Sequence, residues 1–290
     1  MCTVLKYKHR IGRNFDYEIS YKEEIITIPK EKFNNKYSII GVCTGTVKEY
    51  PLLYDGLNEY GLVCCGLAFT NNAKYNTYQE DHKNIPAFDF TFYILGHFKT
   101  VKEVKKFLKN VNIWCEPYSD EIQNTDLHWF IADKKESIIV EQTIDGLEVY
   151  DGEVLTNNPP YPLQIEEDIG NQYFIGDSCT NKKGKEYFTR GTETEMLDGG
   201  YTSSERFTRV SYLKKQLEKT DDNFNPLNET FHLLQSVEQI YGATPVNNSF
   251  EYTIYSVVYD MENIRLWIKT YDKLCPTNYM ITPELERIPL

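Results

Sequence analysis

MCTVLKYKHRIGRNFDYE, residues 1–18, contains two short β-patterned segments on either side of a turn. Residues 3–7 alternate polar and apolar side chains, KHRIG supplies the turn, and GRNFDYEIS begins the next strand. The loop is too short for a crossover helix, so we expect the two strands to pair in antiparallel fashion. Cys2 opens the first strand, and the hairpin would return Arg13 and Asp16 toward it.

Further strands and helices follow in blocks. β-Branched stretches predict strands at 23–29, 37–45 and 58–69. An apolar segment at 86–98 predicts a buried helix, and a second helix at 101–111 has Thr100 and Glu103 at capping-box spacing. Strands return at 127–133, 136–142 and 146–151, with turns between them.

The second half of the chain repeats the alternation. Residues 157–202 are loop-rich and the least regular part of the sequence. Ser203 or Ser204 would cap the next helix, and a further helix over 229–241 would place Leu233, Val237 and Ile240 on one face. Residues 250–272 predict a hairpin around MEN. Alternating blocks of strands and helices indicate a layered α+β fold, and no linker divides residues 1–290 into more than one domain.

Composition narrows the classes of function. The chain has 290 residues, 41% of them hydrophobic, and 23 tyrosines. These values predict a sizeable core in which buried tyrosines find hydrogen-bond partners. The formal net charge of −12 argues against binding to nucleic acid or to anionic lipid.

Cellular location follows from features that the sequence lacks. No apolar run approaches the roughly 20 residues of a membrane helix, and the N-terminus has no apolar signal-peptide core. The seven cysteines include no metal-like CxxC pair. An odd number of thiols in a chain of this length indicates reduced cysteines in the cytoplasm.

Cys2 is the residue with the most distinctive chemistry. If Met1 is removed, Cys2 carries both a nucleophilic thiol and a free α-amine that can act as a base. Arg13 near the sulfur would favour the thiolate, and Asp16 could accept hydrogen bonds from the amine or the thiol. The alternatives are a cysteine on a frayed terminus, and an ordinary exposed Arg–Asp pair.

Other residues could complete or replace this site. Asn157 or Asn158 could donate a side-chain amide to a developing oxyanion, although Asn before Pro also starts turns. The histidines show no metal or triad spacing; His128 and His232 are interpreted as structural. A Cys–His pair built from an internal cysteine stays open. Cys64 and Cys65 would point to opposite faces of their strand. We find no phosphate-binding or dinucleotide-binding motif, and expect no metal or cofactor.

Taken together, MCT, GRNFD, LTNNP and SSERF occur in an order that resembles the choloylglycine hydrolase family of N-terminal nucleophile hydrolases. This family contains bile salt hydrolases and penicillin V acylases. The resemblance covers nearly the whole chain, including DGLNEYGL, VKEVKKFL, LHWFIADKKESIIVEQ and EYTIYS. It implies a four-layer αββα sandwich and a homotetramer.

The resemblance also implies roles for particular residues. Cys2 would be the nucleophile after removal of Met1, with its own α-amine as the base. Arg13 and Asp16 match the residues beside the family's cysteine, and Asn157 matches the oxyanion asparagine. Arg206, in SSERF, matches an arginine that supports the active site.

One departure concerns specificity. The family strand that ends GLNF in bile salt hydrolases, often with tyrosine in penicillin V acylases, reads GLAF here. Ala68 could still offer its backbone N–H to the oxyanion, but it has no side chain to contact the leaving group. The stretch MLDGGYT before SSERF also departs from the family's usual loop, which contains glycine and proline.

The implied substrate is a small amphipathic N-acyl amide whose bulky apolar acyl group binds near Phe15, Tyr50–Tyr54 and Ile122. Glycine- or taurine-conjugated bile salts are the first expectation. Penicillin V and N-acyl homoserine lactones are the alternatives. A protein of another class, an unprocessed and non-catalytic binder of amphipathic anions, is the remote alternative.

Overall fold

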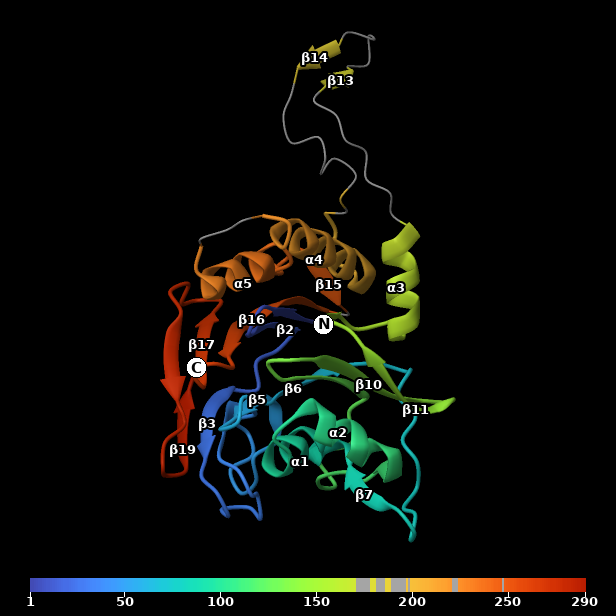
Figure 1. Cartoon of the computed structure of the whole chain (residues 1–290), viewed down its shortest axis with the longest axis vertical. Helices are drawn as coiled ribbons and strands as arrows, with labels where there is room; N and C mark the ends of the chain where they lie inside the picture. Colours follow the sequence, from blue (N-terminus) through green and yellow to red (C-terminus); the bar gives the residue numbers. More distant parts are fainter. Residues whose placement is uncertain (171–177, 181–185, 189–196, 198, 221–223, 247) are drawn as a thin grey trace.

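Two antiparallel sheets face each other and helices cover both outer surfaces, as Figure 1 shows. The computed structural model describes residues 1–170, 178–180, 186–188, 197, 199–220, 224–246 and 248–290. Helices α4 (Ser203–Leu217) and α5 (Pro226–Gln235) cover one sheet, and α1 (Phe90–His97) and α2 (Val101–Phe107) cover the other. The predicted four-layer αββα arrangement is confirmed.

The first sheet, sheet A, joins the N-terminal hairpin to strands from the last fifth of the chain. Its central strands are β1 (Cys2–Tyr7), β2 (Arg10–Tyr17) and β16 (Ser249–Asp260), and the predicted β1–β2 hairpin is present. The sheet has seven strands within the described residues, and the remaining four are β12 (Val154–Leu155), β15 (Thr244–Val246), β17 (Arg265–Thr270) and β18 (Thr277–Met280). Strand β1 is an inner strand because β12 pairs with its other edge.

Sheet B contains the middle strands of the sequence. In the part of the chain that the structure describes it has eight, ordered β11-β10-β9-β6-β5-β4-β3-β19. Their bounds, in chain order, are β3 (Glu24–Ile28), β4 (Ile39–Cys43), β5 (Leu53–Asn58), β6 (Val63–Ala68), β9 (Leu127–Ala132), β10 (Ser137–Thr143), β11 (Gly146–Asp151) and β19 (Glu286–Pro289). Most of these strands match the sequence prediction, whereas β5 and β19 were not predicted.

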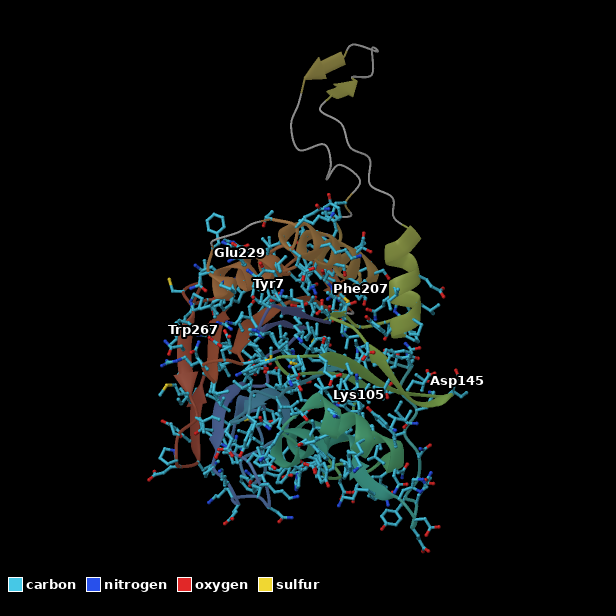
Figure 2. All side chains as sticks on the ribbon, viewed as in Figure 1. Tyr7, Lys105, Asp145, Phe207, Glu229 and Trp267 are labelled. Atoms are coloured by element: carbon cyan, nitrogen blue, oxygen red, sulfur yellow. The ribbon has the colours of Figure 1, made fainter. Side chains whose placement is uncertain are left out.

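Two apolar clusters hold the layers together. One fills the space between the sheets and continues under α4 and α5, and the other lies between sheet B and α1 and α2. Side chains occupy the space between the layers, as Figure 2 shows. Cys65 belongs to the first cluster and Cys64 to the second, so the prediction that they point to opposite faces is confirmed.

Several predicted helix ends were wrong. Thr202, not a serine, caps α4, because its hydroxyl and Glu205 form a complete capping box. Helix α5 ends at Gln235, and Ile240, expected on its buried face, is 60% exposed.

The region 157–202 was predicted to be loop. It contains helix α3 (Tyr161–Gly170) and the strand pair β13 (Ser178–Thr180) and β14 (Glu186–Phe188). Prolines around Tyr161 hid the start of this helix, although Pro is tolerated in a first helical turn. Residues 171–177, 181–185, 189–196 and 198 of this loop prediction, which include Met196 and Asp198 of MLDGGYT, lie outside the described residues.

Two connections complete the fold. Strands β7 (Lys83–Pro86) and β8 (Val111–Trp114) pair in parallel, and α1, α2 and the 3₁₀ turns η1 (Ala87–Asp89) and η2 (Leu108–Asn110) lie between them in sequence. Among the helices described, none combines the length and the apolar character that crossing a membrane would require.

The close approach of β4 and β5 gives a stability prediction. A Cβ added at Gly41 would meet the carbonyl oxygen of Asp55 and lie 2.9 Å from Gly56 Cα, which are both backbone atoms. We expect Gly41→Ala to lower the free energy of unfolding by about 1–3 kcal/mol or more, because backbone cannot move aside easily. Gly199, whose added Cβ would meet nothing within 4 Å, is the matched control. Urea unfolding that gave both variants the same midpoint would contradict the packing argument.

Candidate active site

Cys2 lies at the start of an inner strand and is 3% exposed. It pairs with Phe15 of β2, and Val4 pairs with Arg13. Because side chains alternate along a strand, Cys2, Arg13 and Phe15 share the face that points toward sheet B. The Arg13 Nη2 atom lies 3.6 Å from Cys2 Sγ. The terminus is therefore held inside the sheet rather than frayed.

Arg13 is fixed by a polar cluster between the sheets. Its Nη1 donates to the carboxylate of Asp55, and its Nη2 donates to the Gly66 carbonyl at 2.8 Å. The hydroxyls of Tyr255, at 2.6 Å, and of Tyr259 also donate to Asp55. Buried tyrosines with partners were expected from composition, but Asp55 was missed because DG is also an ordinary turn signal.

Arg13 stays charged although it is buried. Arg13 and Asp16 are 1% and 0% exposed, so the alternative of an ordinary exposed pair is wrong. Burial alone lowers the pKa of Arg13, but its interactions with Tyr255, Cys2 and Cys65 outweigh burial and raise that pKa. The guanidinium therefore presents a positive charge to the Cys2 sulfur.

Asp16 lies on the opposite face of the hairpin from the Cys2 thiol. Its carboxylate accepts from Thr253 Oγ1 at 2.5 Å and from Gln239 Nε2 at 2.9 Å, and one oxygen lies 3.9 Å from Arg206 Nη1. The carboxylate thus contacts Thr253, Gln239 and Arg206 rather than the Cys2 thiol. Asp16 therefore stabilises the side of the hairpin that faces away from the Cys2 thiol.

Arg206 of α4 connects that face to Cys2. Its Nη1 donates to the Cys2 carbonyl and to Thr3 Oγ1, both at 2.6 Å, and its Nη2 donates to Asn157 Oδ1 at 3.0 Å. Burial lowers the pKa of this guanidinium, and the Asp16 carboxylate offsets part of that effect. One buried cation thus contacts the Cys2 backbone and the Asn157 side chain.

Asn157 lies directly beside the start of the chain. Its Oδ1 accepts from the Cys2 backbone nitrogen at 2.6 Å, and its Nδ2 donates to the Ala68 carbonyl at 2.8 Å. An amide nitrogen has two hydrogens, so one is left to face a substrate oxygen. Asn158 is directed elsewhere and donates to Thr70 O at 3.0 Å. The geometry therefore favours Asn157 over Asn158 as the oxyanion donor.

The Ala68 backbone can supply a second donor. Phe69 N–H donates to the carbonyl of Asp126, directly before β9, and alternate residues of an antiparallel strand direct their N–H groups to opposite sides. Ala68 N–H therefore points toward β5, whose pairing with β6 has already ended. The carbonyls of Gly66 and Ala68 accept from Arg13 and Asn157 on this same open side.

A cavity of about 380 Å³ opens over the Cys2 thiol. Phe15 and Ile122, predicted to bind substrate, both lie on its wall, whereas Tyr50 packs against Phe33 and Phe92 instead. The lining residues of most use to an apolar acyl group are Phe15, Leu52, Leu53, Tyr54, Ala68, Phe88, Ile122 and Leu127. Within the described residues, no cluster of His, Cys, Asp or Glu side chains has the form of a metal site.

Met1 occupies the position before the nucleophile. Its ammonium nitrogen lies 2.5 Å from Asp16 O and 3.0 Å from Glu251 Oε1, and its carbonyl accepts from Asp16 N at 2.8 Å. With Met1 present, the Cys2 nitrogen is a peptide N–H and not an amine. The prediction that the α-amine acts as base applies to the chain without Met1.

The internal cysteines have a different environment. Burial raises the pKa of Cys64 and Cys65, with Arg13 offsetting part of the effect, and burial raises that of Cys43 to about 11. The nitrogens of His128 contact Glu141 and Thr156 rather than a thiol. These three thiols are protonated core groups, so Cys2 is a better candidate nucleophile than any of them.

Comparisons with known proteins agree with this arrangement. Residues 2–281 match the family model for linear amide C–N hydrolases, choloylglycine hydrolase family. The chain is 36% identical over 292 residues to a bile salt hydrolase/transferase of Lactiplantibacillus plantarum, covering 94% of this chain and 90% of the relative.

Two solved structures support the same fold. The C2A variant of conjugated bile acid hydrolase from Clostridium perfringens superposes with a TM-score of 0.90 at 31% identity, covering 100% of this chain and 97% of that one. Penicillin V acylase from Agrobacterium tumefaciens gives a TM-score of 0.70 at 18% identity, with coverages of 100% and 86%, and shares the fold. The chain belongs to the choloylglycine hydrolase family and is a hydrolase acting on linear amide C–N bonds.

Proposed function

We propose that this protein is an N-terminal cysteine amidase that cleaves glycine- and taurine-conjugated bile acids through a Cys2 thioester. The observation that carries the proposal is the environment of the Cys2 thiol. It lies beneath a cavity of about 380 Å³, with Arg13 3.6 Å from the sulfur and Asn157 on the Cys2 nitrogen. A charged arginine, an amide donor and an apolar wall are what nucleophilic cleavage of an N-acyl amide requires.

The reaction begins with acylation of Cys2. After removal of Met1, the α-amine takes the thiol proton and the thiolate attacks the amide carbonyl carbon. The negative charge on the carbonyl oxygen is stabilised by Asn157 Nδ2–H and Ala68 N–H. The C–N bond then breaks as the α-ammonium returns the proton to the departing amine, which leaves a thioester on Cys2.

Deacylation reverses the proton movements. The α-amine takes a proton from water, the hydroxide attacks the thioester, and the C–S bond breaks as the α-ammonium returns the proton to the sulfur, which restores the thiol and releases the acid. Asn157 Oδ1 lies 2.6 Å from the Cys2 nitrogen, so it would orient the free amine in the processed protein. An amine that replaced water would instead receive the acyl group, consistent with a relative named hydrolase/transferase.

The substrate proposal rests on the cavity and the named relatives. Apolar side chains dominate the wall near Phe15 and Ile122, which suits the steroid part of a bile acid. Penicillin V is the second candidate because Ala68 removes the side chain that separates the two preferences, and an N-acyl homoserine lactone is the third. The remote alternative, an unprocessed binder of amphipathic anions, requires that Met1 is retained.

Three further properties belong to the same proposal. Both sheets combine N-terminal and C-terminal strands, which supports a single domain over residues 1–290. Family resemblance supports a homotetramer. The six described cysteines are free thiols, which supports a cytoplasmic location.

Replacing the nucleophile tests the mechanism. We expect Cys2→Ala to abolish release of glycine and taurine from conjugated bile acids, because no other thiol in the described part of the chain donates to or accepts from Arg13. Intact-mass measurement of the active protein should show that Met1 is absent. Activity that survived in Cys2→Ala would point to an internal cysteine. Full activity of protein that retains Met1 would contradict the α-amine as base.

Substrate preference can be measured on the unmodified protein. We expect kcat/KM to be higher for glycocholate and taurocholate than for penicillin V or N-acyl homoserine lactones, since the cavity wall suits a bulky apolar acyl group. Amine release should be followed for all substrates under the same conditions. Rapid penicillin turnover with negligible bile-salt turnover would replace the first substrate with the second.

Asp55 offers a test of how Arg13 is held. Asp55→Asn keeps the shape but removes the negative charge opposite Arg13, so we expect a loss of about 3–5 kcal/mol in the free energy of unfolding. Alkylation of Cys2 by iodoacetamide and kcat/KM should fall as well, because Arg13 would no longer be fixed beside the sulfur.

The matched control is Asp151→Asn. Asp151 bonds Lys105 at 2.8 Å on the surface and is 83% exposed, so its loss should cost less than about 1 kcal/mol and leave alkylation unchanged. Equal effects of the two substitutions would show that the buried pair has no special role.

A further inference from the structure

We propose that His128 and Glu141 form a positioning pair that fixes the oxyanion donors Asn157 and Ala68 relative to each other. This inference rests on the proposed function, which assigns those donors. His128 is on β9 and Glu141 on β10, and both side chains are 0% exposed. Neither lines the cavity, so any effect on the reaction would pass through the residues they hold.

The pair holds both ends of the turn that carries Asn157. His128 Nε2 lies 2.9 Å from the carbonyl oxygen of Thr156, directly before Asn157. Both carboxylate oxygens of Glu141 lie 3.1 Å from the backbone nitrogen of Tyr161, at the other end of the turn. His128 Nδ1 and Glu141 Oε1 are 2.9 Å apart, which links the two ends.

The same histidine also contacts the strand that carries Ala68. His128 pairs with Leu67 in the β6–β9 ladder. Its ring stacks on that of Phe69, with centroids 4.3 Å apart and planes 8° from parallel. Leu67 and Phe69 flank Ala68, so His128 touches the neighbours of both oxyanion donors.

Hydrogen-bond chemistry requires a particular pair of side chains here. The Thr156 carbonyl can only accept, and an ionised Glu141 can only accept. Both bonds of His128 therefore need a proton, as imidazolium with carboxylate, or as neutral imidazole with carboxylic acid. In either form, the two protons of the pair make one hydrogen bond between His128 and Glu141 and one from His128 to the Thr156 carbonyl. An apolar residue of similar size in place of His128 would leave Glu141 and the Thr156 carbonyl without these hydrogen bonds.

A second side chain, Gln164 of α3, holds the turn without reaching β6. Its Oε1 accepts from Thr156 Oγ1 at 3.0 Å, and its Nε2 donates to Asn157 O at 2.7 Å. Within the described residues, loss of His128 would therefore leave the turn intact, with only the bonds from Asn157 to Ala68 O and from Asn158 to Thr70 O to hold it beside β6. Small misplacements of this kind can lower a rate by about 10²-fold without unfolding the protein.

Kinetics of His128→Leu test the proposal. We expect kcat for glycocholate to fall about 10- to 100-fold while KM changes less than about threefold, because the donors act on the oxyanion and not on substrate binding. His82→Leu, at an exposed histidine, is the matched control and should leave both constants unchanged. An unchanged kcat in His128→Leu would overturn the proposal.

Substitutions of Glu141 separate hydrogen bonding from packing, because glutamine can keep the hydrogen bonds and leucine cannot. In Glu141→Gln the amide oxygen can accept from Tyr161 N, while the amide nitrogen donates to a neutral His128. We expect Glu141→Gln to keep kcat within about threefold and Glu141→Leu to behave like His128→Leu. If His128→Leu does not fold by circular dichroism, this pair of variants decides: equal kcat values would overturn the proposal.

A double-mutant cycle separates this inference from the proposed function. Asn157→Ala should lower kcat by about 10²–10³-fold, and His128→Leu added to it should cause little further loss. Fully multiplicative losses would show that His128 does not act through Asn157. If Asn157→Ala leaves kcat unchanged, or Cys2→Ala stays active, the proposed function fails rather than the positioning role alone.

Discussion

The buried contact between Arg13 and Asp55 joins the two sheets at the point where the site is built. Arg13 comes from sheet A and Asp55 from sheet B, and Tyr255 and Tyr259 complete the hydrogen bonds of the carboxylate. A buried ion pair contributes little net stability, but a sheet displaced by one residue would leave its charges unpaired at a high cost. The contact therefore selects one alignment of the sheets, which puts the cation at 3.6 Å from Cys2 Sγ.

Local patterns in the sequence predicted much of the fold. β-Branched runs and short loops identified most strands of sheet B, and the hairpin over residues 1–18 correctly brought Arg13 back toward Cys2. Alternation along a strand was enough to separate Cys64 from Cys65. These features depend on neighbours within a few residues, where periodicity and turn chemistry are informative.

Long-range contacts could not be read in the same way. Arg206 contacts the Cys2 carbonyl across 204 positions, and only family resemblance indicated it. Asp55 was not identified as a site residue, and Asp16 was expected to accept from the α-amine or the thiol, whereas its carboxylate accepts from Thr253. Strand β19 escaped notice because ERIP is polar, short and ends near proline. In each case the residue or strand contacts an element that is distant in the sequence, and local sequence patterns do not predict where that element lies.

The inner position of β1 sets an order of events during synthesis. The proposed mechanism requires removal of Met1, and an aminopeptidase must bind an extended, accessible terminus to remove it. Cys2 is only 3% exposed once the sheet has formed. Strand β16, which pairs with β2, begins at Ser249. At typical ribosome speeds the chain needs roughly 12 to 50 s to reach that strand. The growing chain thus has a limited period in which maturation can precede closure of the sheet.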